Sequence, residues 1–375
     1  MLIFCFHFFL GGGSTKLIND SRAYLALAQG ERAGIPFDSR ILGPFIASSI
    51  NAVFGLPSIG AFQLLTFISL IASLLLMRRI ISGQRGLPVW QAAVLLTLGC
   101  ASATTFGYTP VMVDLLLLVL ASLTLLAVAR NRWMVVLLLS VLSTVTKEYG
   151  ILLGIACAAV AWSRNHKKVA TVIALSPILV LVVVVLVESG SGPVTPDSWQ
   201  GFVKAMLGYH KSLFNFRGAF AYVELLYMWC WSVLWPVLLI AIGVLFARFR
   251  SGEQMTDLEI VFTVMLFALP VLLLGDWGRS LLIIVPFASA VATRHEITRN
   301  RRFVALIAIG GVSTAMARPF HGGFLIPEAL TIAMTITSIA SSVLIGFQIL
   351  RFRPVIDLLN YDSAIETPIR GTADR

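Results

Sequence analysis

The sequence predicts an all-α fold, a polytopic bundle of transmembrane helices. Of its 375 residues, 58% are hydrophobic and only 12% are charged, whereas soluble domains carry about a quarter charged residues. Apolar runs recur along almost the whole chain, and several are long enough to cross ~30 Å of hydrocarbon as a helix. A transmembrane β-barrel would need strands of alternating polarity, and the run LVLVVVVLV at 179–187 does not alternate.

The apolar runs predict about twelve membrane segments, some of them short. We expect them at 1–11, 58–77, 89–106, 112–129, 133–146, 150–163, 169–187, 221–246, 258–275, 280–293, 303–317 and 326–350. Arg and Lys concentrate in cytoplasmic connections of membrane proteins, and here they occur at every second connection. These cations are Arg78, Arg79, Arg85, Arg130, Arg132, Arg164, Lys167, Lys168, Arg248, Arg250, Arg294, Arg299, Arg301, Arg302, Arg351 and Arg353.

This alternation predicts that the N-terminus and the tail 354–375 are cytoplasmic. The whole net charge of +10 then falls on the inner side. Membrane topology thus explains the basic composition, and no nucleic-acid partner is expected.

Two of the predicted outer connections are long, at 12–57 and 188–220. Within the first, the amphipathic stretch 18–30 predicts a helix lying along the membrane interface. The apolar stretch 41–54 is too short for a span and predicts a re-entrant or surface helix. We find no internal repeat and no linker, so residues 1–353 are expected to form one transmembrane domain.

Ionisable residues collect on the predicted outer side, where they are candidates for function. The candidates are Asp20, Tyr24, Asp38, Arg40, Lys147, Glu148, Asp276, Arg279, Arg318 and His321. Asp114 lies at a helix start on the same side, and we interpret it as a charge favoured by the helix dipole. Arg and Lys suit the binding of a phosphate, and a carboxylate suits the role of general base.

Lys147 and Glu148 lie between two apolar runs of about fourteen residues each. A helix of that length spans ~21 Å, less than the hydrocarbon core. The turn is therefore predicted below the outer surface, at the floor of an outward-facing cavity, with Glu148 orienting Lys147. The short segment 280–293, after Asp276 and Arg279, predicts a second recessed turn.

Four stretches carry a resemblance to a known superfamily. They are NDSRAY at 19–24, PFDSRILGP at 36–44, TKEYG at 146–150 and GDWGR at 275–279. Together with the topology, they resemble the bacterial C-type integral membrane glycosyltransferases, which use polyprenyl-phosphate-linked sugars. The resemblance implies that Asp20 is the acid of the first outer loop, acting as catalytic base or facing a metal, with Asp38 second. The other candidate residues would bind substrate and its phosphate; the cofactor, including any divalent metal, is left open.

The resemblance implies transfer of a sugar to a glycan, lipid or protein acceptor on the outer face of the bacterial cytoplasmic membrane. Three alternatives stay open. A transporter or flippase of lipid-linked glycans would place its site near the membrane midplane. A glycan polymerase or ligase typically has a larger late outer loop, and a non-catalytic scaffold would leave Asp20 and Lys147 far apart.

Overall fold

The computed structural model describes residues 19–33, 37–83, 87–106, 111–190, 235–272, 281–317 and 328–351. In these ranges all regular elements are helical, which confirms the predicted all-α class. The first part of the chain forms α2 (Asn19–Ala28), η1 (Phe37–Ser39), α3 (Leu42–Phe54), α4 (Ser58–Gly83), α5 (Pro88–Phe106), α6 (Asp114–Val128), α7 (Trp133–Thr146), α8 (Gly150–Ser163) and α9 (Lys167–Gly190). The second part forms α12 (Trp235–Ser251), α13 (Asp257–Leu272), η2 (Leu281–Ile283), α15 (Val285–Ala292), η3 (Glu296–Arg299), α16 (Arg301–Ala317) and α17 (Glu328–Arg351).

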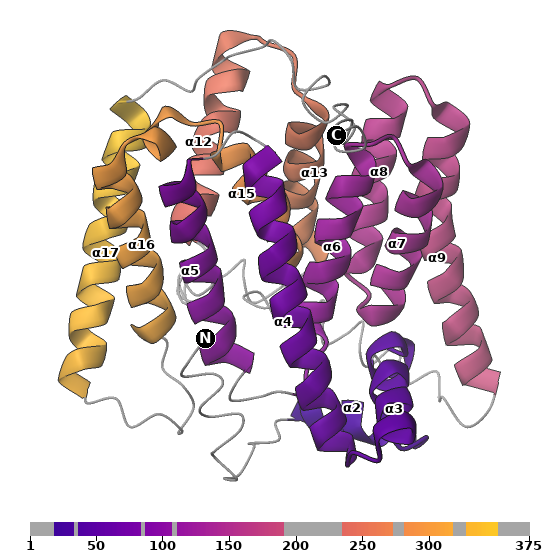
Figure 1. The fold of residues 1–375 in the computed structure, drawn as a ribbon. Coiled ribbons are helices and arrows are strands. Elements are labelled where there is room, and N and C mark those ends of the chain that lie inside the picture. Colours follow the sequence, from indigo (N-terminus) through magenta and orange to yellow (C-terminus); the bar gives the residue numbers. More distant parts are fainter. Residues whose placement is uncertain are drawn as a thin grey trace, which may run out of the picture.

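The long helices stand roughly side by side and form one bundle (Figure 1). Helices α6, α7, α8 and α9 pack in chain order at one side of the bundle, whereas α5 packs against α16, far away in the sequence. Glycines allow close approaches: a Cβ atom on Gly311 of α16 would lie 2.4 Å from the Thr97 side chain of α5. Small residues at helix crossings are typical of membrane bundles.

Two described helices are long and apolar enough to cross a membrane, namely α4 and residues 167–184 of α9. Several others are apolar but shorter, so the count of twelve segments stays a prediction. Large apolar side chains are exposed on α4, α7, α9 and α17, as expected for surfaces in contact with lipid.

The predicted segment boundaries agree in part with the helices. The stretches 18–30 and 41–54 form α2 and α3. The predicted segment 280–293 is not one helix but the 3₁₀ turn η2 followed by the eight-residue helix α15, with Pro286 in its first turn. Proline favours the first helical turn because it lacks an N–H group. Residues 1–11, 188–220 and 354–375 lie wholly or mostly outside the described residues.

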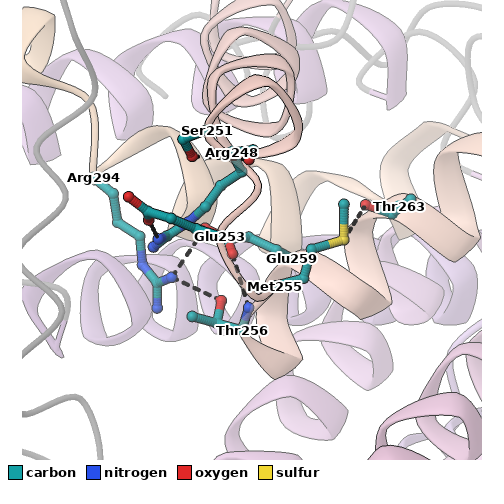
Figure 2. Close-up of polar contacts among 8 residues, drawn as sticks. All are labelled: Arg248, Ser251, Glu253, Met255, Thr256, Glu259, Thr263 and Arg294. Carbon is teal, nitrogen blue, oxygen red and sulfur yellow. Dashed lines mark hydrogen bonds and ion pairs between the residues drawn. The ribbon is translucent and has the colours of Figure 1, made fainter.

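Four connections predicted to be cytoplasmic meet at one end of the bundle. Arg164, after α8, contacts Asn131 between α6 and α7 and Asp257 at the start of α13. Nearby, Arg248 and Arg294 converge on Glu259 (Figure 2). These four basic connections therefore share one pole, as their alternation in the sequence predicts; that this pole is cytoplasmic stays a prediction.

Glu259 is the centre of this polar cluster. Its carboxylate is fully buried and accepts from Arg248 Nε at 3.4 Å, from Arg294 Nη1 at 3.3 Å and from the Thr256 backbone N–H at 2.9 Å. Arg248 also contacts Glu253, whose side chain is 28% exposed. A buried carboxylate is tolerated when it is paired and hydrogen-bonded, so this cluster joins α12, α13 and the connection after α15.

We expect Glu259→Gln to lower the free energy of unfolding by about 3 kcal/mol, because it leaves one buried and one partly buried guanidinium group against a neutral amide. The matched control is Glu253→Gln, which removes a more exposed partner of the same arginine and should cost about 1 kcal/mol or less. Thermal unfolding in detergent measures both. Equal losses for the two variants would contradict the central role of Glu259.

Candidate functional site

The turn between α7 and α8 is short and directs successive side chains to opposite sides. Lys147 has an extended backbone, with φ −160° and ψ 136°. Its N–H donates to the Ser143 carbonyl at 3.0 Å, and its own carbonyl accepts from Gly150 N–H at 2.8 Å. Because side chains alternate along an extended backbone, Lys147 and Glu148 reach different partners.

Gly150 allows the two helices to meet this closely. A Cβ atom there would lie 2.2 Å from the Ser143 carbonyl carbon of α7. The two helices have fourteen residues each, as the sequence predicts, and Lys147 is only 1% exposed. The turn is therefore buried within the protein; its depth below the outer membrane surface stays a prediction.

Lys147 pairs with Asp114, the first residue of α6. Lys147 Nζ lies 2.7 Å from Asp114 Oδ1, and both side chains are 1% exposed. The N-terminus of α6 also favours a negative charge at this position. Asp114 is thus more than the helix-end charge that its sequence context suggests. A buried lysine needs a nearby anion, and this requirement is the signal in the sequence that could have pointed to Asp114.

Glu148 pairs with Arg40 of the first predicted outer loop. Arg40 Nε lies 2.8 Å from Glu148 Oε2, and Arg40 Nη2 lies 2.6 Å from Oε1. Such bidentate contacts are among the stronger charge-assisted hydrogen bonds. The sequence-based expectation was that Glu148 orients Lys147, but the structure directs Glu148 to Arg40 instead.

Tyr24 completes the contact between the first loop and the bundle. Arg40 Nη1 donates to the Tyr24 hydroxyl at 2.9 Å, and the Arg40 guanidinium lies 4.8 Å from the Phe37 ring centroid. The Tyr24 ring packs edge-on against Phe37 and also lies near Phe62 of α4. Burial raises the pKa of Tyr24 to about 12, so its hydroxyl keeps its proton at physiological pH.

The two candidate acids lie on the elements that carry these contacts. Asp20 is partly buried in the first turn of α2, one helical turn before Tyr24, so the two residues share a helix face. Asp38 lies in η1, two residues before Arg40; its side chain is outside the described residues. Four further candidates, Asp276, Arg279, Arg318 and His321, also fall outside them.

The structure therefore joins Tyr24, Arg40 and Glu148 in one hydrogen-bonded chain, with the pair of Lys147 and Asp114 directly beside it. In the described ranges, no three His, Cys, Asp or Glu side chains form a group that could hold a metal ion. The arrangement offers carboxylates and cations at one end of the helix bundle, opposite the pole of Glu259.

Comparison with known protein families identifies the chain. A family model described as glycosyltransferase family 87 matches residues 52–275, more than half of the sequence. The chain belongs to glycosyltransferase family 87. It is therefore a membrane glycosyltransferase of the C-type superfamily. Comparisons with curated proteins and with solved structures gave no match.

The family 87 match covers only one side of the site. Asp114, Lys147 and Glu148 lie inside the matched region, whereas Tyr24, Arg40 and both candidate acids precede it. The pair of Arg40 and Glu148 thus joins the region typical of family 87 to the loop that carries Asp20 and Asp38.

We expect Gly150→Ala to lower the free energy of unfolding by about 1–3 kcal/mol, because the added methyl group would overlap the α7 backbone. Gly99→Ala in α5 is the control, since a Cβ there meets no atom within 4 Å. That change should be neutral or stabilising by up to about 1 kcal/mol. A thermal unfolding midpoint of Gly150→Ala at or above that of the wild type would contradict the close approach of α7 and α8.

A double-mutant cycle tests the contact between the first loop and the turn. Arg40→Gln and Glu148→Gln should each destabilise the protein, and the double variant should lose less than the sum, with a coupling energy of about 1–3 kcal/mol. Glu31→Gln, an exposed acid of the same loop, should change stability by less than about 0.5 kcal/mol. Additive effects of the two main changes would argue against the ion pair in the membrane.

Proposed function

We propose that this family 87 enzyme transfers a sugar from a polyprenyl-phosphate donor to a glycan, lipid or protein acceptor at the outer face of the bacterial cytoplasmic membrane. Membership of a glycosyltransferase family supports the reaction class. The resemblance of the first-loop and turn motifs to C-type enzymes supports the donor class. The charge alternation supports cytoplasmic termini and an outward-facing site.

One observation carries the placement of the site. The bidentate pair of Arg40 and Glu148 holds η1 and α2 against the recessed turn between α7 and α8. The loop with the candidate acids therefore lies over a cluster of buried charges. A donor with a lipid tail between the helices and a phosphate at this depth would meet both cations and carboxylates.

The proposed reaction is a displacement at the anomeric carbon of the donor sugar. Asp20 takes the proton of the acceptor hydroxyl as general base, and Asp38 is the second candidate for this role. The acceptor oxygen forms the new bond to the anomeric carbon, while the bond from that carbon to the phosphate oxygen breaks. The electron pair of the broken bond leaves with polyprenyl phosphate.

Cations at this pole would stabilise the charge on the leaving phosphate. A guanidinium carries five N–H donors. Tyr24 and Glu148 occupy three of those on Arg40, so within the described part of the chain two are left for a phosphate. Lys147 adds a positive charge beneath them. We assign Arg279, Arg318 and His321 to the same phosphate, and Asp276 to the substrate, on the basis of their motifs.

The assignment of the base predicts a clear effect of Asp20→Asn. The variant should keep its fold and membrane insertion, and its rate of sugar transfer should fall by roughly 10²–10⁴-fold, because acid–base catalysis contributes this much. The measurement uses purified enzyme in lipid nanodiscs with a series of polyprenyl-phosphate sugars and membrane extract as the acceptor source. Product is followed by the labelled sugar.

Asp38→Asn serves as the comparison for the second candidate, and Glu31→Gln as the control in the same loop. Full activity of Asp20→Asn would exclude Asp20 as the base, and a loss in Asp38→Asn alone would transfer the role to Asp38. Absence of transfer from every polyprenyl-phosphate donor by the wild type would overturn the donor class.

A further inference from the structure

Two buried polar groups beside the proposed site lack part of their hydrogen bonding. Asp114 uses Oδ1 for Lys147, and its Oδ2 is buried without a hydrogen-bond partner in the part of the chain that the structure describes. Buried carboxylate oxygens nearly always have a partner in native proteins. This oxygen therefore points to a group that donates a hydrogen bond to it.

The hydroxyl of Tyr24 offers a hydrogen-bond donor, which complements the acceptor on Asp114. Its hydroxyl oxygen accepts from Arg40, and no acceptor for its hydrogen occurs among the described residues. A phenol can donate one hydrogen bond in addition to those it accepts. Because Tyr24 is 1% exposed, bulk water does not supply that acceptor.

The two groups belong to one cluster. Tyr24 contacts Arg40, which holds Glu148, and Glu148 is the chain neighbour of the lysine that binds Asp114. Tyr24 is also within electrostatic range of both Lys147 and Asp114. The structure thus brings together a buried donor and a buried acceptor that do not bond to each other.

A hydroxyl group satisfies both at once, because it accepts one hydrogen bond and donates another. A fully ionised anion has no hydrogen to donate to Asp114 Oδ2, and an ammonium group would give Tyr24 no acceptor. We propose that Tyr24 and Asp114 together recognise one hydroxyl of the sugar carried by the donor. This inference rests on the proposed function and adds a residue, Asp114, that recognises substrate.

The neighbouring charges favour the donor sugar over the acceptor. The sugar is attached directly to the phosphate, and Lys147 and Arg40 are the buried cations of the described cluster. An unpaired carboxylate beside a phosphate would repel it; Lys147 neutralises Asp114 and removes this repulsion. The carboxylate can then accept from a sugar hydroxyl close to the phosphate.

A cycle between protein variants and substrate analogues tests the proposal. The probes are the polyprenyl-phosphate sugar that the wild type uses best and its analogues that lack one hydroxyl each. Binding to nanodisc-embedded wild type, Asp114→Asn and Tyr24→Phe is measured by calorimetry. A site built to bind a hydroxyl rejects the analogue that lacks it, because its buried polar groups are left unpaired.

We expect one analogue to bind the wild type about 10- to 100-fold more weakly than the intact donor. For Asp114→Asn, the Kd of this analogue should exceed that of the intact donor by about threefold or less. Tyr24→Phe should also reduce the ratio of the two Kd values for the same analogue. Asp257→Asn is the control at the opposite pole; it removes a charged partner of Arg164 and should keep the wild-type pattern.

Equal discrimination by the wild type and both variants for every analogue would overturn the proposal and assign the two polar groups to an enclosed water. If Asp114→Asn weakens the binding of the donor and of all its analogues by the same factor, Asp114 has a structural role only, which also overturns the proposal. If Asp114→Asn does not fold, the milder Tyr24→Phe carries the same test. Suppose that the wild type binds and transfers the intact donor, but neither variant changes the discrimination between the donor and its analogues. This result would refute the inference and leave the proposed function intact.

Discussion

The ion pair between Arg40 and Glu148 is the contact on which the geometry of the site depends. It joins residues 108 positions apart, and both guanidinium edges are in use, one by the carboxylate and one by Tyr24. Without it, η1 and α2 would be attached to the bundle mainly by apolar packing, which fixes position less strictly than a bidentate contact. The candidate base Asp20 depends on this attachment, because it lies one helical turn from Tyr24.

The two poles of the bundle use buried charge in different ways. Around Glu259 two arginines and a backbone N–H converge on one carboxylate, which suits a role in joining helices. At the opposite pole, Asp114 keeps one oxygen and Arg40 keeps two N–H donors for which the described residues provide no partner. Incomplete hydrogen bonding in a buried cluster costs stability, and functional sites are where proteins accept such a cost.

Some predictions from the sequence could be made securely, and others could not. The helical class, the sharing of one pole by four basic connections and the two fourteen-residue helices around Lys147 follow from hydrophobic run lengths and charge spacing, which are local properties. The pairing of Glu148 with Arg40 was not predictable, because the two residues are adjacent only after the first loop folds back. The sequence suggests only a helix-end charge for Asp114, because a carboxylate at the start of a helix is explained by the helix dipole without any ion-pair partner.

The sequence by itself determined that the chain forms apolar helices with cations at alternate connections, and it predicted that the candidate acids and cations lie on the other side of the membrane. Hydrophobicity and charge are sufficient for this, because insertion into lipid depends on them directly. Only the tertiary structure decided which charges meet. The extended backbone of Lys147 and the close helix approach at Gly150 send neighbouring side chains to different partners, and that choice depends on three-dimensional packing.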